Sequence, residues 1–380
     1  MHLSIPFTEP FVTDPRIEKF ARILVDYSTR VQPGDRVAVT TSTAAEPVAQ
    51  ALFALILDRG AYPHILMEFA EQEEILFAHG SDEQLEYVPL FHKMAFEELD
   101  VLIKVKAEPH TRYLSGIDPA RQAHRQKSLS HLLNAQIRRG AANELRWMST
   151  IFPTRAYAME AEMGFEEYQD FFYRACHADG NTPDPVAYWQ NVDRIQRRFV
   201  ERIEGHDKVE IQGPNADLTL SVKGRKFLNA SGQHNMPDGE IYTGPVEDSA
   251  NGWVRYTYPA VYLGRVVEGV ELTFQEGRVV KATAEKNQDY LLEMLNTDPG
   301  ARYLGEFAIG TNYEIDRSTR SILFDEKIGG SFHTAVGTGY PETGSHNQSL
   351  IHWDMICDMR QDSEIRADGE VIYRNGQFIL

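Results

Sequence analysis

Side chains that can bind a metal ion gather in the part of the chain after Gly232. They lie in four irregular segments, residues 235–252, 303–310, 325–344 and 347–358. The candidate ligands are Glu240, Glu306, His333, Tyr340, His352 and Asp354. Two divalent ions bridged by carboxylates need ligands of this type and number. The sequence therefore predicts a metal site in this region.

His352 and Asp354 belong to a segment, Leu350–Cys357, that has the pattern of a β-strand. Alternate side chains of a strand share a face, so this histidine and this carboxylate can converge on one cation. The opposite face would then enter the core with Ile351, Trp353, Met355 and Cys357. The alternative is a hydrogen-bonded His–Asp pair with a purely structural role.

Glu306 stands in an almost entirely apolar segment, YLGEFAIG. A buried position is therefore expected, and a carboxylate there needs a compensating positive charge or it becomes protonated. A metal ion would supply that charge. An ion pair with Arg302 or Lys327 would supply it as well.

The three remaining candidates lie next to turns. His333 and Tyr340 belong to a glycine-rich stretch, KIGGSFHTAVGTGYPE, in which the backbone can turn sharply and approach a ligand closely. Glu240 follows the turn sequence Pro-Asp-Gly and begins a strand. Taken singly, they also fit a loop histidine, a packed aromatic ring and a solvated glutamate.

The strands and helices that must position these residues follow one pattern before residue 180 and another after it. Before residue 180, strand patterns at 35–42, 62–69, 101–106 and 144–151 alternate with helical patterns at 48–56, 91–99 and 165–176. This alternation predicts an α/β domain with a mostly parallel, doubly wound sheet. The loop after the first strand, TTSTAAEP, contains no glycine, so no nucleotide-binding motif is present.

Three regions follow from these patterns. Residues 1–184 are expected to form the α/β scaffold domain, and residues 185–206 a helical connector. Residues 207–380 alternate strands with tight turns and predict an α+β, antiparallel-β-rich catalytic domain with one helix at 287–295.

The net charge, the lengths of the apolar runs and the number of cysteines indicate which partners and which compartment to expect. The formal net charge of −18 argues against nucleic acid and membrane partners. No apolar run is long enough to span a membrane, and the segment MHLSIPFTEPF lacks the features of a signal peptide. Only two cysteines occur, Cys176 and Cys357, so we expect a cytoplasmic protein.

The segments NMPDGEIYTGPVEDSANG, DEKIGGSFHTAVGTGYPETG and NQSLIHWDMICD resemble those of the thermophilic-type metalloaminopeptidases, the aminopeptidase T and aminopeptidase S family. The resemblance runs the length of the chain. It implies hydrolysis of the N-terminal residue from peptides with a free N-terminus, two divalent ions (Zn, Co or Mn) and a homodimer. It also implies that the metal ligands are Glu240, Glu306, His333, Tyr340, His352 and Asp354.

Within that set, two residues are expected to take part in the reaction. Glu306 is the expected bridging or base-like carboxylate because its apolar setting would couple it strongly to the metals. Tyr340 is expected to stabilise the oxyanion. The stretch between Tyr340 and His352 is eleven residues, shorter than in some family members, and His346 within it is expected to be an exposed loop residue.

The same residues would also fit two functions other than that of a metalloaminopeptidase. His333, His352 and Asp354 alone would suit one Fe(II) in a ring-cleaving dioxygenase of the same fold. Such a site leaves Glu240 and Glu306 without a role. The other rival is a metal-free binding protein in which the polar pairs are structural.

Overall fold

The computed structural model describes residues 14–379, so the segment on which the signal-peptide prediction rests lies outside it. The chain divides into two compact units, which we describe separately. The first contains the residues up to 159 together with 163–189 and 232–236; the second contains 160–162, 190–231 and the residues from 237 onward. The short return of the chain to the first unit at 232–236 was not expected from the sequence.

The first unit is built on a five-stranded parallel sheet with the strand order β2-β1-β3-β4-β8. The strands are β1 (Arg36–Ser42), β2 (Tyr62–Glu68), β3 (Val101–Lys106), β4 (Arg146–Ile151) and β8 (Asn235–Met236). The first four confirm the strands predicted from the sequence. β1 and β3 are centrally placed and buried, which explains their continuous apolar runs.

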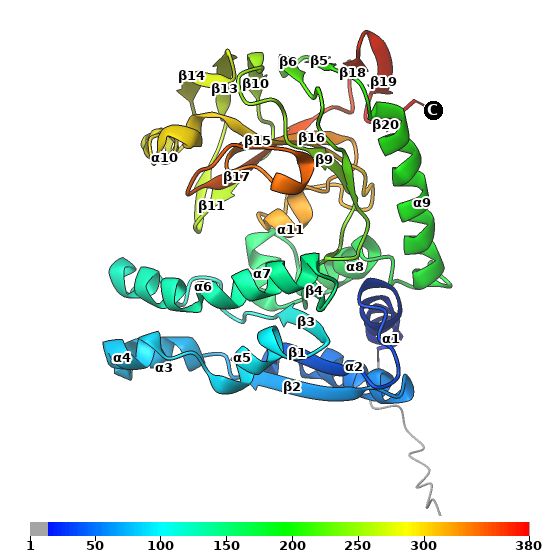
Figure 1. The fold of residues 1–380 in the computed structure, drawn as a ribbon, viewed down its shortest axis with the longest axis vertical. Coiled ribbons are helices and arrows are strands. Elements are labelled where there is room, and N and C mark those ends of the chain that lie inside the picture. The colour runs from blue at the N-terminus through cyan, green and yellow to red at the C-terminus, as the bar shows by residue number, and fades with distance from the viewer. Residues whose placement is uncertain (1–13, 380) are drawn as a thin grey trace, which may run out of the picture. The chain divides into compact units, whose positions relative to one another are not determined.

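Helices pack on this sheet (Figure 1). They are α1 (Pro15–Arg22), the π-helix η1 (Ile23–Ser28), the 3-10 helix η2 (Thr43–Ala45), α2 (Glu46–Asp58), α3 (Gln72–His79), α4 (Asp82–Glu86), α5 (Leu90–Glu97), α6 (Pro119–Ala141), α7 (Arg155–Glu160) and α8 (Phe165–Ala175). α1 contacts α2, and α5 contacts α6. Ala95 on α5 joins Ala38 and Leu102 of the sheet in one apolar cluster. The predicted doubly wound α/β class is therefore confirmed.

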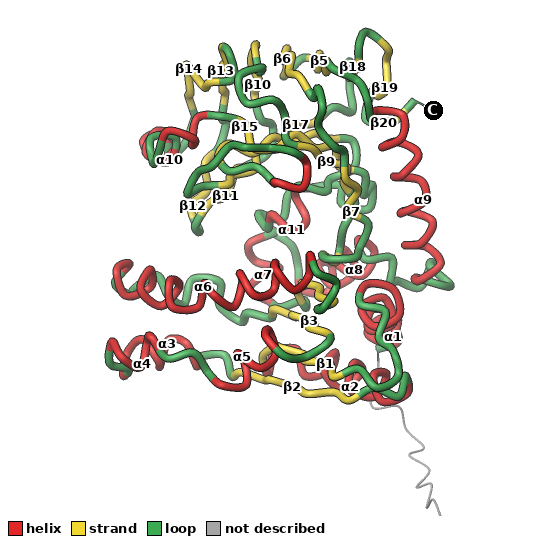
Figure 2. Tube along the Cα trace, viewed as in Figure 1, coloured by secondary structure: helices red, strands yellow, loops and turns green. Residues whose placement is uncertain are grey.

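The second unit contains two large antiparallel sheets, whose strands Figure 2 shows in yellow. The eight-stranded sheet has the order β14-β13-β10-β6-β5-β18-β19-β20 and the five-stranded sheet the order β17-β16-β15-β9-β7. The eight are β5 (Lys208–Gly213), β6 (Ala216–Ser221), β10 (Asn251–Arg255), β13 (Glu271–Gln275), β14 (Arg278–Thr283), β18 (Glu364–Ala367), β19 (Glu370–Arg374) and β20 (Gln377–Phe378). The five are β7 (Leu228–Ala230), β9 (Glu240–Thr243), β15 (Leu304–Gly310), β16 (Ser331–Gly337) and β17 (His352–Asp358).

The remaining elements are short, apart from one long helix. β11 (Ala260–Tyr262) and β12 (Arg265–Val267) form a hairpin, and the helical elements are α9 (Pro185–Ile203), α10 (Gln288–Met294), η3 (Pro299–Arg302), α11 (Ile322–Asp325) and η4 (Pro341–Thr343). The helices predicted at the connector and at 287–295 are present. Among the described residues, no helix is both long and apolar enough to cross a membrane.

One apolar core fills the space between the two large sheets. The eight-stranded sheet contributes residues such as Val209 and Leu272, and the five-stranded sheet contributes Phe307, Phe332 and Trp353. Because strand side chains alternate, the other face of the five-stranded sheet is free to carry polar groups. That face positions the candidate site.

Candidate metal centre

The register of the five-stranded sheet sets the candidate ligands in rows on one face. Glu306 on β15 lies opposite Ala335 on β16, which in turn lies opposite Asp354 on β17. His333 is two residues before Ala335, and His352 is two residues before Asp354, so both share that face. Glu240 begins the neighbouring strand β9.

The predicted core face of β17 is confirmed by the same alternation. Ile351, Trp353, Met355 and Cys357 all belong to the apolar core of the second unit. The predicted burial of Glu306 is also confirmed, since it is 4% exposed.

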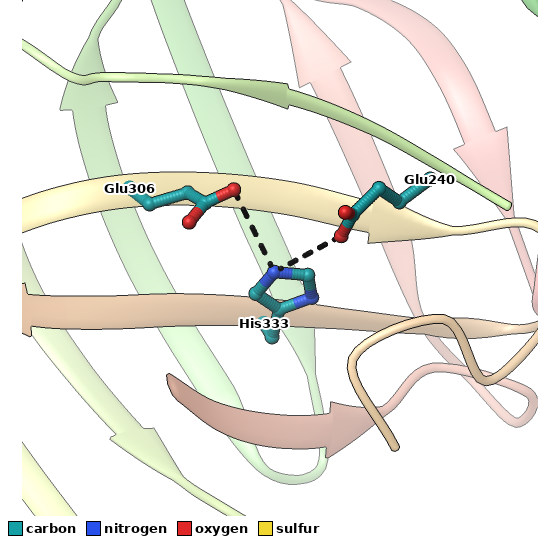
Figure 3. Close-up of side chains that lie close together, drawn as sticks. All are labelled: Glu240, Glu306 and His333. Atoms are coloured by element: carbon teal, nitrogen blue, oxygen red, sulfur yellow. Dashed lines mark ion pairs between the residues drawn. The ribbon is translucent and has the colours of Figure 1, made fainter. Parts of the chain in front are cut away.

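Five of the six potential ligand side chains thus come together, in two overlapping groups. The ligand atoms of Glu240, Glu306 and His333 lie within 4.8 Å of one another, and so do those of Glu306, His352 and Asp354. Figure 3 shows the first group, with the imidazole of His333 between the two carboxylates. Glu306 belongs to both groups. His333 Nε2 lies 3.9 Å from Oε1 of Glu306, and His352 Nε2 lies 3.2 Å from Oε2, so each histidine faces a different oxygen of the shared carboxylate.

Two buried carboxylate oxygens of this cluster, Glu240 Oε2 and Asp354 Oδ1, accept no hydrogen bond from the described residues. His333 Nε2 lies 3.4 Å from Glu240 Oε2, and His352 Nε2 lies 3.4 Å from Asp354 Oδ1. Buried carboxylates of this kind need a positive charge. The side chains present therefore fit a site for divalent cations.

The pKa values show how strongly these groups depend on one another. Burial alone would lower the pKa of His333, yet Glu306 and Glu240 raise it to about 9. Burial would likewise raise the pKa of Asp354, but His352 outweighs it and brings the pKa to about 2. Burial raises the pKa of Glu240 to about 8 in spite of Lys327. Protonated imidazoles thus supply the charge that a divalent ion would replace.

His352 is held in one orientation by the backbone. Its Nδ1 donates to the carbonyl of Thr338 at 2.8 Å, which turns Nε2 toward Glu306 Oε2 at 3.2 Å. A histidine ligand is commonly fixed in this way by a hydrogen bond from its second nitrogen. The position of the Thr338 carbonyl depends on the preceding residue, Gly337. Its φ is +105°, and a Cβ there would meet the carbonyl oxygen of Ile351 at 2.1 Å.

Tyr340 lies at the edge of the cluster rather than within it. It is 38% exposed, and its hydroxyl is 3.5 Å from His352 Nε2. Its ring makes an edge contact with the ring of Tyr242, a residue that the sequence did not single out. Tyr242 lies two residues after Glu240 and therefore on the same face of the sheet. His346 is exposed, as expected.

Lys327 is not the partner of Glu306 that the sequence suggested. Its Nζ lies 3.4 Å from Glu240 and 3.9 Å from Asp238, and it also pairs with Glu326. Arg302, the other suggested partner, donates to Asn296 and to a backbone carbonyl. In the described residues neither cation pairs with Glu306. Lys327 is 0% exposed, and its pairing with Glu240 could be recognised only from the three-dimensional structure.

The sequence matches a known protein family over nearly its whole length. Residues 13–378 match the model of the family described as thermophilic metalloprotease (M29). The chain is 27% identical to aminopeptidase 2 of Geobacillus stearothermophilus and 28% identical to aminopeptidase AmpS of Bacillus subtilis (strain 168). In each case the alignment covers 96% of this chain and 98% of the relative.

Two solved structures share the fold. AmpT from Thermus thermophilus superposes with a TM-score of 0.83 at 22% identity, over 96% of this chain and 99% of that one. A 2,5-dihydroxypyridine dioxygenase from Pseudomonas putida KT2440 gives a TM-score of 0.61 at 14% identity, over 96% of each chain.

Proposed function

Because the chain belongs to the thermophilic metalloprotease (M29) family, and is thus a peptide hydrolase, we propose that it is an aminopeptidase with a dinuclear metal site. The observation that carries the proposal is the pair of ligand groups that share Glu306. One carboxylate common to two groups is the arrangement that bridges two divalent ions. The relatives named aminopeptidase support the substrate class, peptides with a free N-terminus.

The candidate ligands would be distributed between two metal ions. Glu240 and His333 would hold one ion, His352 and Asp354 the other, and Glu306 both. Such ions, when bound, polarise a scissile carbonyl and lower the pKa of a coordinated water. We propose Zn, Co or Mn for this role, because carboxylate and imidazole ligands suit these metals.

Tyr340 completes the proposed site at its exposed edge. Its hydroxyl, close to His352, is placed to donate a hydrogen bond to the oxygen on which negative charge develops in the transition state. The Thr338 carbonyl keeps His352 oriented during this step. Lys327 neutralises part of the charge on Glu240, which leaves one oxygen of that carboxylate free for a metal.

The activity can be tested with aminoacyl anilides that carry either a free or an acetylated amine. We expect release of the anilide only from the free amine, loss of activity with a chelator, and recovery with Co(II), Zn(II) or Mn(II). Equal cleavage of the acetylated substrate would contradict an aminopeptidase.

The dioxygenase alternative shares the fold but not the arrangement of ligands. It needs His333, His352 and Asp354 around one iron, whereas these residues fall into two ligand groups that have only Glu306 in common. Oxygen consumption on an aromatic substrate, with one tightly bound iron, would overturn the peptidase proposal.

We also propose a cytoplasmic homodimer. The two cysteines, Cys176 and Cys357, are free and buried, which fits a reducing compartment. A monomer in light scattering at micromolar concentration would contradict the dimer.

A further inference from the structure

A cavity in the first unit lies where ligands bind in many α/β proteins. In the strand order β2-β1-β3-β4, the chain passes from β1 to β2 on one side and then to β3 on the other, so the order reverses between β1 and β3. Crevices at the carboxyl ends of strands at such a point are common binding sites. Here the ends of β1, β2 and β3 line a cavity of about 610 Å³.

Lys104 supplies an uncompensated positive charge to this cavity. Its Nζ donates to Gln136 Oε1 at 2.8 Å and lies 5.5 Å from the ring of Trp147 and 5.9 Å from that of Phe96. No carboxylate of the described residues forms an ion pair with it. Burial, with a smaller effect of Lys106, lowers its pKa to about 8. An anion beside this ammonium group would remove that penalty.

Glutamates supply negative charge to the same cavity. Five of them line it: Glu68, Glu71, Glu73, Glu74 and Glu108. Glu68 lies 3.4 Å from His92 Nε2, and Glu73 accepts a hydrogen bond from the hydroxyl of Tyr113. Glu108 is half-buried, and burial raises its pKa even though Lys106 acts in the opposite direction. A cation beside Glu108 would therefore be stabilising.

We propose that this cavity binds a small zwitterion, an amino acid or a short peptide, with its carboxylate on Lys104 and its ammonium group on the glutamates around Glu108. Lys104 lies on β3 and Glu108 two residues after its end, and both line the cavity. The volume is ample for a short peptide, since ligand pockets typically measure about 300–1,000 Å³. The residues that line this cavity all belong to the first unit, whereas the candidate metal ligands belong to the second, and the proposal does not rest on the proposed peptidase activity.

The probe should carry both charges but no bond that the enzyme can hydrolyse. δ-Aminovalerate has an amine and a carboxylate separated as in a dipeptide, without the amide. Valerate and δ-aminovaleramide each lack one of the two charges. Titration calorimetry with the full-length protein should show binding of δ-aminovalerate, and binding at least about tenfold weaker for each of the other two. Glycine, titrated in parallel, distinguishes an amino acid from a peptide as the preferred ligand.

Variants separate this site from the metal centre. Lys104→Met should weaken δ-aminovalerate binding about tenfold or more, because a charge-assisted hydrogen bond is lost. Lys93→Met, on the exposed surface of α5, is the matched control and should bind like wild type. Glu306→Gln should also bind like wild type, because it alters only the second unit.

Three results would overturn the inference. They are the absence of binding by both δ-aminovalerate and glycine, equal binding of δ-aminovaleramide, and unchanged binding by Lys104→Met. The comparison of ligands on the wild-type protein does not depend on whether the variant folds. If the wild-type protein hydrolyses aminoacyl anilides but binds neither δ-aminovalerate nor glycine, this site alone is refuted. Binding that persists without hydrolysis would refute only the proposed function.

Discussion

At the scale of single residues, the candidate site depends as much on small side chains as on ligands. Ala335 lies directly between Glu306 and Asp354 across three strands, and Ala308 lies opposite His333. Both alanines are fully buried. Because opposite residues of neighbouring strands point to the same side, these methyl groups form the floor of the space between the ligands.

Ala335→Val should therefore impair metal binding without removing a ligand. Its two additional methyl groups would enter the space between Glu306 and Asp354, where overpacking costs roughly 1–3 kcal/mol. We expect metal affinity to fall about tenfold or more, as measured by competition with a chromogenic chelator. Ala335→Gly, which adds no bulk, is the control and should keep its affinity. Wild-type affinity in Ala335→Val would show that the ions do not occupy this space.

At the scale of elements, the close approach of β16 to the residue before β17 positions His352. Gly337 N donates to the Tyr303 carbonyl, and Thr338 N donates to the Ile351 carbonyl at 2.7 Å. The Thr338 carbonyl then receives the hydrogen bond from His352. One glycine thus sets both the separation of the strands and the direction of a candidate ligand.

Gly337→Ala should lower stability and metal affinity together. Gly205→Ala is the matched control, because Gly205 has a φ of +89° but a Cβ there would meet nothing within 4 Å, whereas Gly337 has a φ of +105° and a close neighbour. Both variants carry the strain of a positive φ, about 1–2 kcal/mol, and Gly337→Ala adds roughly 1–3 kcal/mol of overpacking. Urea unfolding and metal titration measure the two effects. Equal losses in the two variants would contradict the role assigned to Gly337.

The alternation of apolar residues made many elements predictable from sequence. The first four strands of the first sheet follow from short apolar, β-rich runs, and the core face of β17 follows from a period-two pattern. The helix α6 could not be predicted in this way, because its mean pattern is polar and its buried positions include Arg125, Gln136 and Arg139. Strand β8 could not be predicted either, because it has only two residues and pairs with β4 across a long sequence separation.

The candidate site was predictable in its residue types but not in its arrangement. The apolar neighbours of Glu306 indicated a compensated carboxylate, yet nothing local to Lys327 showed that it faces Glu240 instead. The division into two groups that share Glu306 depends on register between β15, β16 and β17. The register between strands that are far apart in the sequence is set by tertiary packing, so it cannot be predicted from any single segment.

At the scale of the whole molecule, the charges of the candidate site link metal binding to stability. His333 has an ordinary pKa of 6.5 and a folded pKa of about 9. Its contribution to stability is therefore complete below pH 6.5 and is lost as the pH rises through 9. Glu240 acts in the same direction, since its pKa rises from 4.5 to about 8 on folding.

The metal-free protein should therefore lose thermal stability between about pH 6.5 and pH 9, whereas the metal-loaded protein should not. The reason is that a bound divalent ion replaces the protons that the free site gives up. Melting temperatures of chelated and loaded protein across this range provide the test. A chelated protein that melts at the same temperature throughout would contradict the electrostatic coupling of the site.

The most direct test of the dinuclear proposal is the number of metal ions per chain in wild type, Glu306→Gln and Glu271→Gln. Glu271, on β13 in the other sheet, pairs with Lys281 and serves as the matched control. Elemental analysis by mass spectrometry should find two divalent ions per chain in wild type and in the control. It should find far less than one in Glu306→Gln, because that side chain belongs to both ligand groups. A single iron per chain that persists in Glu306→Gln would contradict the account.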